Sequence, residues 1–204
     1  MRETDTYKTI GNKSSGLYKD KGSKFIALAF PVHSEEEVKE RLEEVKKQYY
    51  DARHHCYAYV IGYEGDRFRY NDDGEPSGTA GKPIHGQILS HELCNILVVV
   101  VRYFGGTKLG VRGLINAYKG AAKEAILQNT ILTKTIRSHY QVAFQYPAMN
   151  DVMRVMKEQE LVQHVQDFDL HCRIEFSVRK TRARKAVSQL EEMPHVKLTY
   201  LYTK

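Results

Sequence analysis

Apolar residues in the first 130 positions fall into short runs that predict five strands of a sheet. The runs around Leu17 and over residues 25–30 are broken by glycine, which is typical of strands joined by tight turns. Residues 57–61 and 68–70 predict two more strands. The run over residues 96–101 is apolar throughout and rich in β-branched side chains, so we expect a central strand that is covered on both faces.

Three other segments of this region have helical spacing. Apolar positions between residues 38 and 49 are three or four apart, and Ser34 with Glu37 forms a capping box in front of them. A short helix is predicted through residues 84–89. The third helix, after residue 113, carries on one face apolar side chains that are mostly small and so allow close packing against a sheet: Leu114, Tyr118, Ala121, Ala122 and Ala125.

The pattern changes near residue 133, and from there the apolar positions predict elements in the order β-α-β-β-α-β. This is the order of a ferredoxin-like sandwich. We therefore predict an α+β protein with two domains, residues 1–131 and 132–204, and a boundary near residues 131–135. No flexible linker is visible at that boundary, so the two domains are expected to lie close together.

Composition narrows the class of protein. The chain of 204 residues is 42% hydrophobic and 27% charged, an ordinary balance for a folded protein, so a wholly disordered chain is excluded. The longest apolar run has six residues, far fewer than the roughly 20 of a membrane-spanning helix, so no membrane partner is expected. Residues 1–5 lack an apolar signal region, which predicts a cytoplasmic location. The three cysteines are far apart and support neither a disulfide framework nor a zinc motif, and no metal or cofactor is predicted.

The strongest local signal is a glycine-rich loop over residues 105–113, between the predicted central strand and the following helix. Four glycines let backbone N–H groups approach a ligand without an intervening Cβ atom. Unpaired N–H groups and the dipole favour negative charge at a helix N-terminus, and the chain has a formal net charge of +6. We expect an anion site or nucleic-acid site formed by Arg102, Gly105, Gly106, Thr107, Lys108, Gly110 and Arg112.

The helix after this loop extends the positive charge. Its spacing places Arg112, Asn116, Lys119 and Lys123 on one face, opposite the alanines, where they would track successive phosphates. The alternative is an ordinary solvated helix face. Neither a Walker A pattern nor a GxGxxG fingerprint is present, so a nucleotide-hydrolysing P-loop and a Rossmann dehydrogenase are not indicated.

The only candidates for catalysis are weak, and they lie at the start of one strand and in a long loop over residues 71–83. Asp72, Asp73 and Glu75 would share a proton or hold a cation, or else serve only as turn-forming residues with exposed charge. His54 would be a base or a ligand, or a hydrogen-bonded structural residue. The sequence alone therefore identifies no reaction.

A second basic cluster lies in the C-terminal part of the chain. Residues 133–204 contain 12 Lys and Arg against 8 Asp and Glu, a net charge of +4. Five of seven consecutive positions at the predicted start of a helix are basic, although cations there oppose the helix dipole. Nucleic-acid contact is predicted for these residues, with a solvated surface as the alternative: Arg179, Lys180, Arg182, Arg184 and Lys185.

Three blocks, residues 51–59, 72–83 and 102–110, together resemble the IMPACT/YigZ family, in particular its bacterial two-domain members. The resemblance covers residues 16–130 and implies a first domain with the fold of ribosomal protein S-five domain two, a βα sandwich. It implies a second domain similar to the ferredoxin-like domains of elongation factor G. Eukaryotic relatives regulate translation, whereas bacterial relatives have no settled activity. Both folds are often found in proteins that bind RNA or the ribosome, although a fold does not determine a function.

Three functions remain open from the sequence. The leading one is a non-enzymatic protein that binds RNA or the ribosome through the glycine loop, the helix face and the second basic cluster, with a role in regulating translation. The second is an enzyme acting on a small phosphorylated or otherwise anionic metabolite held by Lys108, Arg112 and backbone amides, with His54 or a loop carboxylate as acid or base. The third is a protein-interaction module with an exposed apolar patch near residues 103–104 or on the sheet of the second domain. The oligomeric state is not determined.

Overall fold

The computed structural model describes residues 5–168 and 172–204 of a mixed α+β protein. The chain forms two compact units, which are described separately. One unit comprises Lys8–Lys134, and the other joins Thr135–Lys204 with the residues up to Tyr7. In the described part of the chain, no helix is both long enough and apolar enough to cross a membrane.

The unit Lys8–Lys134 is built on a five-stranded antiparallel sheet. Its strands follow one another across the sheet in the order β2 (Ser14–Asp20), β3 (Ser23–Pro31), β6 (Ile96–Tyr103), β4 (His54–Ile61) and β5 (Arg67–Asn71). The side chains of residues 96–101 on β6 are all fully buried. The predicted central strand is therefore confirmed, because it lies between two neighbours and under helices on both faces.

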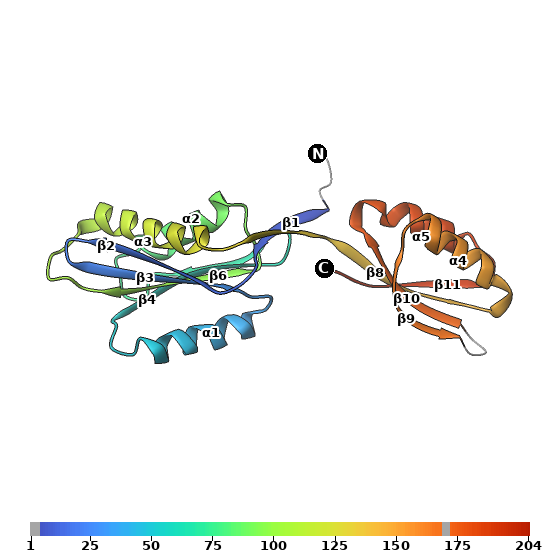
Figure 1. Ribbon diagram of the computed structural model, residues 1–204, viewed down its shortest axis with the longest axis horizontal. Coiled ribbons are helices and arrows are strands. Elements are labelled where there is room, and N and C mark those ends of the chain that lie inside the picture. Colours follow the sequence, from blue (N-terminus) through green and yellow to red (C-terminus); the bar gives the residue numbers. More distant parts are fainter. Residues whose placement is uncertain (1–4, 169–171) are drawn as a thin grey trace. The chain divides into compact units, whose positions relative to one another are not determined.

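Helices cover both faces of this sheet, as Figure 1 shows. One face carries α1 (Glu35–Gln48), where Val38 and Val45 pack against β6. The opposite face carries α2 (Gly81–Ser90) and α3 (Gly110–Leu127). The small residues of α3 allow the close approach that the sequence predicts, since a Cβ atom on Gly16 of β2 would lie 2.4 Å from the backbone nitrogen of Ala125.

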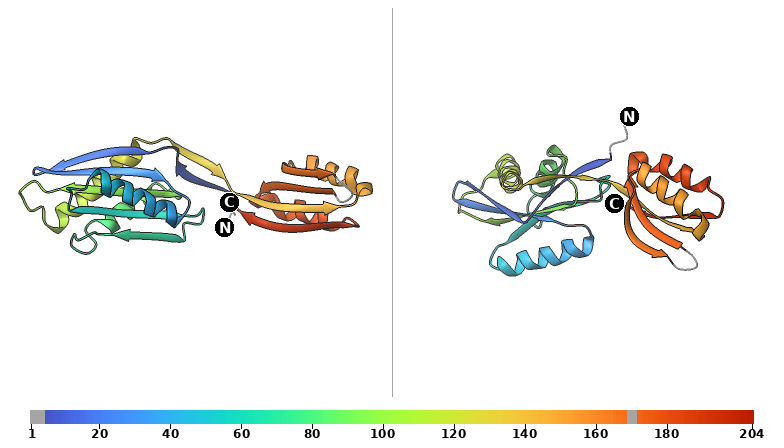
Figure 2. Two further views of the ribbon diagram at one scale, coloured as in Figure 1. Left: turned by 90° about the horizontal axis from the view of Figure 1, so that it is seen from below. Right: turned by 45° about the vertical axis from the view of Figure 1, so that its right-hand side comes forward.

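The second unit contains a four-stranded antiparallel sheet with two helices on one face. Along the chain come β8 (Arg137–Phe144), α4 (Met149–Glu158), β9 (Val162–Phe168), β10 (Cys172–Arg179), α5 (Ala183–Glu191) and β11 (Val196–Thr203), which confirms the predicted β-α-β-β-α-β order. Short 3-10 turns, η1 (Tyr146–Ala148) and η2 (Lys180–Arg182), precede the two helices. The sheet order is β11-β8-β10-β9, and Figure 2 shows α4 and α5 on the same face.

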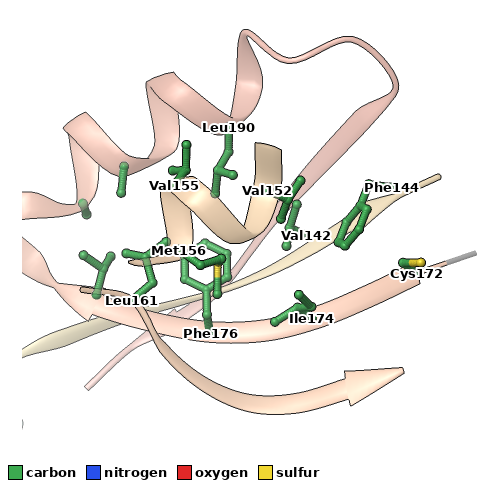
Figure 3. Packing of buried hydrophobic residues seen from close by; sticks show 13 residues of the cluster. Val142, Phe144, Val152, Val155, Met156, Leu161, Cys172, Ile174, Phe176 and Leu190 are labelled. Carbon is green, nitrogen blue, oxygen red and sulfur yellow. The ribbon is translucent and has the colours of Figure 1, made fainter. Parts of the chain in front are cut away.

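The core of this unit lies between the helices and the sheet. Figure 3 shows Phe144 and Phe176 reaching from the strands toward Val152 and Leu190 on the helices. These residues are less than 4% exposed. The alternating apolar positions of the sequence therefore mark the helix-covered face of the sheet, and the residues between them belong to the other face.

One pair of strands was not predicted. β1 (Thr6–Ile10) and β7 (Ile131–Thr135) form a separate two-stranded sheet. Four of the five residues of β7 are exposed, so no buried face imposes an alternating pattern on its sequence.

Candidate functional site

The glycine loop connects the end of β6 to the start of α3 and is exposed from Phe104 to Lys108. Gly106 and Gly110 have φ angles of +87° and +70°, in the left-handed region that glycine adopts most readily. Gly105 serves a different purpose, because a Cβ atom there would lie 1.9 Å from the carbonyl carbon of Gly22. The loop is thus packed main chain against main chain on the turn between β2 and β3.

The backbone N–H groups of this loop are largely available. The N–H of Gly105 donates to Ser23 Oγ at 3.1 Å. In the part of the chain that the structure covers, no hydrogen bond uses the N–H of Gly106, Thr107 or Lys108. α3 begins directly afterwards, and no side chain caps its first turn. Free donors and the positive end of an 18-residue helix therefore meet at the same place.

Four exposed cations continue from the loop along α3. Among the described residues, none of these side chains forms an ion pair: Lys108, Arg112, Lys119 and Lys123. The residues between them on the opposite side of the helix, including Ala117 and Ala121, are fully buried. The positive row therefore faces away from the sheet, and no carboxylate in the described part of the chain forms an ion pair with it.

The structure adds three lysines that sequence reasoning missed. Lys19, Lys21 and Lys24 are exposed and flank the turn that packs against Gly105. Lys19 and Lys24 stand directly opposite each other in the antiparallel pair of β2 and β3. Like charges in this position are destabilising, so their presence favours an anionic partner at this end of the sheet. They are distant from the glycine loop in sequence, and only the contact between the two turns brings them to it.

Arg102 differs from the other predicted members of the site because it is buried. It is 8% exposed, and its Nη1 atom donates to Glu75 Oε1 at 2.6 Å. The hydroxyl of Tyr118 donates to the same carboxylate oxygen at 2.8 Å. The Arg102 guanidinium lies over the ring of Phe25, 5.5 Å from its centre. Arg102 and Glu75 therefore form a buried ion pair, and Arg102 is not part of the exposed surface.

The candidate catalytic residues hold the long loop in place. The carboxylate of Asp72 accepts hydrogen bonds of 2.8–3.0 Å from the N–H groups of Gly78, Ala80 and Gly81, and so caps α2. Asp73 accepts a hydrogen bond of 2.6 Å from the N–H of His55.

His54 belongs to the same set of loop contacts. Its Nδ1 atom lies 2.8 Å from the carbonyl oxygen of Asp73. The structure brings His54, Asp72, Asp73 and Glu75 together. The hydrogen bonds and the ion pair of these side chains are made to other groups of the same loop and sheet. Within residues 5–168 and 172–204, no three His, Cys, Asp or Glu side chains are placed to hold a metal ion.

Cys56 lies beside this network and is also buried. Its sulfur is 3.3 Å from the hydroxyl of Tyr118 and 3.0 Å from the carbonyl oxygen of Asp72. Burial raises the pKa of the Cys56 thiol far above its ordinary value, and the neighbouring carboxylates raise it further. Burial likewise raises the pKa of Tyr118. Both shifts favour the protonated forms, whereas nucleophilic cysteines have a lowered pKa.

The second basic cluster spans η2 and the start of α5 and is partly neutralised. Arg182 donates to Glu160 at 2.6 Å, and Arg179 lies 3.7 Å from Asp5. Arg184 and Lys185 are exposed and form no ion pair among the residues described. This cluster belongs to the unit Thr135–Lys204, whereas the glycine loop belongs to the other unit.

Comparisons with known proteins agree on one family. Residues 21–126, which include both loops, match the Impact N-terminal domain. The chain is 39% identical over 134 residues to IMPACT family member YigZ of Escherichia coli (strain K12), covering 65% of this chain and 66% of that protein. It is 35% identical over 140 residues to IMPACT family member YvyE of Bacillus subtilis (strain 168), covering 69% and 64%. The chain thus spans somewhat less than two thirds of the length of these relatives.

Longer matches extend to the second unit. An IMPACT family member of Haemophilus influenzae is 28% identical over 184 residues, which cover 88% of this chain and 89% of that protein. A crystal structure of a hypothetical protein superposes with a TM-score of 0.72 and 26% identity, covering 98% of this chain and 99% of the other. Because the Impact N-terminal domain match covers more than half of the sequence, this chain belongs to the IMPACT family.

Proposed function

We propose that this protein is a non-enzymatic RNA-binding protein that holds single-stranded or ribosome-associated RNA on the glycine loop and the outer face of α3. The observation that carries the proposal is the row of exposed cations without carboxylate partners, which starts at the free N–H groups of the loop. A phosphate would sit at the N-terminus of α3, where donors and dipole both favour it. Further phosphates would follow the cations along the helix.

The dimensions of α3 suit a polymer better than a single small anion. Arg112 and Lys123 are three turns apart, or about 16 Å at 1.5 Å per residue. Such a row supports contact with several phosphates in succession. The β2–β3 turn supplies additional positive charge at the loop end of the row.

The buried network argues for binding without catalysis. His54, Asp72, Asp73 and Glu75 are committed to loop contacts and an internal ion pair. The proposal includes a translation-related role, which is supported by membership of the IMPACT family together with the eukaryotic IMPACT homologues. It also includes the finer fold assignment, a sandwich like ribosomal protein S-five domain two followed by a ferredoxin-like unit.

The test is a binding titration of labelled single-stranded RNA at several salt concentrations. Affinity should fall with salt with a log–log slope of roughly 0.7 per neutralised phosphate. The triple variant R112A/K119A/K123A should reduce affinity and lower the slope by about 2. The matched control K39A/K46A/K47A removes the same charge from exposed positions of α1 and should bind like wild type. Equal losses in both triple variants, or binding that ignores salt, would contradict the proposal.

A further inference from the structure

The sheet of the unit Thr135–Lys204 has a face that neither α4 nor α5 covers (Figure 2). On β8 and β10 the even-numbered residues enter the helix-covered core, as Val142 and Phe176 do in Figure 3. Since side chains alternate along a strand, the odd-numbered residues belong to the opposite face. We call that face the uncovered face, and its residues on β8 and β10 are Arg137, His139, Gln141, Ala143, Arg173, Glu175, Ser177 and Arg179.

Three aromatic rings cross the uncovered face in one row. The ring of His139 stacks on Tyr202 of β11, with centres 4.4 Å apart, and on His164 of β9, with centres 5.2 Å apart. The planes differ by 22° and 20°, so the three rings are nearly parallel. His164 is fixed by a hydrogen bond of 2.8 Å between its Nε2 atom and Ser177 Oγ.

Irregularities in both edge strands produce this row. The register of β11 shifts between Tyr200 and Tyr202, so that Leu201 is an extra residue and Tyr202 comes opposite His139. The register of β9 against β10 also shifts, and His164 is the extra residue there. β-Bulges re-aim side chains and are typical of functional edges. Regular strands would have turned Tyr202 to the other face.

A row of three cations lies beside the row of rings. Arg137 stands between Arg179, its partner on β10, and Lys204, which directly follows β11 and exchanges backbone hydrogen bonds with Arg137. Arg137 is held by hydrogen bonds of 2.9 Å to Oγ and to the carbonyl oxygen of Ser177. Lys204 places its ammonium 5.3 Å from the centre of the Tyr202 ring. Asp5, next to Arg179, is the acidic partner that the structure shows for this row.

Three cations in register across adjacent strands repel one another, which is unfavourable without an anion. Burial lowers the pKa of Arg137, and the nearby Arg179 lowers it further. Rings that stack with bases next to cations that bind phosphates are the two elements of single-strand recognition on sheet surfaces. Charge and ring arrangement therefore both favour a single-stranded nucleic acid as the occupant.

We propose that the uncovered face is a second binding site, for single-stranded nucleic acid, in which bases stack on His164 and Tyr202 and phosphates follow Lys204, Arg137 and Arg179. His139 is 7% exposed and acts as a spacer between the two outer rings. Each outer ring stacks on His139 through one side, and a base stacking on Tyr202 would share that ring with the Lys204 ammonium. This site is independent of the α3 surface, which belongs to the other unit and carries no comparable row of rings in its cation face.

The test compares two labelled oligomers of equal length and charge, a single-stranded RNA and the corresponding abasic strand. Wild-type protein should prefer the strand with bases. Y202A and H164A should each reduce that preference by about fivefold or more, which is the loss of one stacked base. Y202F keeps the ring and should retain the preference. The matched control Y200A removes an exposed tyrosine from the same strand and should also retain it.

The outcomes separate the two sites. R112A/K119A/K123A should weaken binding of both oligomers and leave the preference for bases intact, so the α3 proposal can fail while this one stands. Equal binding of the two oligomers by wild type would overturn the second site. So would an unchanged preference in Y202A and H164A, or equally strong competition by an acidic polypeptide without bases. Circular dichroism of each variant confirms that its fold is retained.

Discussion

Arg102 precedes the glycine loop and Arg112 lies near the end of it, in the first turn of α3, and the two have opposite environments. Arg102 is 8% exposed and paired with Glu75, whereas Arg112 is exposed and, among the described residues, has no acidic partner. In the sequence both are basic residues within three positions of a glycine. The comparison shows that burial decides the role of each arginine: the buried one forms an internal ion pair, and the exposed one is available to a ligand.

Removing Glu75 should have the largest effect, because it leaves the Arg102 guanidinium buried without a counter-charge. E75A should lower the free energy of unfolding by about 3–5 kcal/mol, measured by urea denaturation. The double variant E75L/R102M removes both charges and should recover a large part of that loss. R112A is the matched surface change and should alter stability by less than about 0.5 kcal/mol. Equal losses of unfolding free energy in E75A and R112A would contradict the different roles assigned to the two arginines.

The contact between the two turns should produce the next largest effect. G105A places a Cβ atom 1.9 Å from a backbone carbon of Gly22 and should lower the free energy of unfolding by about 1–3 kcal/mol. The control is G86A in α2, where the new Cβ atom has no neighbour within 4 Å. That change should stabilise the protein by about 0.5–1 kcal/mol, since alanine is the better helix former. Loss of stability in both variants would show that the contact with Gly22 is not the cause.

The smallest expected effect is the pH dependence of stability that the buried His139 gives to the unit Thr135–Lys204. Burial lowers the pKa of His139, and the neighbouring His164, Lys204 and Arg137 lower it further. The unfolded chain therefore takes up a proton at this site at a higher pH than the folded chain does. Stability of the unit should fall as pH drops below the unfolded value of about 6.5 and continue to fall until the folded pKa is passed. Thermal melting between pH 7.5 and 5 should show a smaller pH dependence in H139Q than in wild type.

Most regular elements were predictable because at least one face of each is buried. The apolar run of β6 and the apolar spacing of α1 and α3 follow from the layers that cover them, and the β-α-β-β-α-β order of the second unit follows in the same way. β7 escaped prediction because its residues are exposed, and a strand without a buried face has no alternating signal.

The candidate site was predictable only where it is local in sequence. The glycine loop and the cations of α3 form one continuous segment, so helical spacing alone places them together. Lys19 and Lys24 join that end of the sheet through a contact between distant turns. The ring row of Tyr202, His139 and His164 depends on two register shifts, which no periodicity in the sequence reveals. Pairing register depends on tertiary packing, so the position of these rings could not be predicted from the sequence.

The contact between Gly22 and Gly105 has a mechanical consequence. Because no side chain separates the two turns, neither can accommodate a shift of the other by rotamer exchange. A phosphate bound at the glycine loop, as proposed above, would therefore also act on the tip of the hairpin formed by β2 and β3. Occupancy of the loop would be transmitted to the β2 edge of the sheet without any change in the helices.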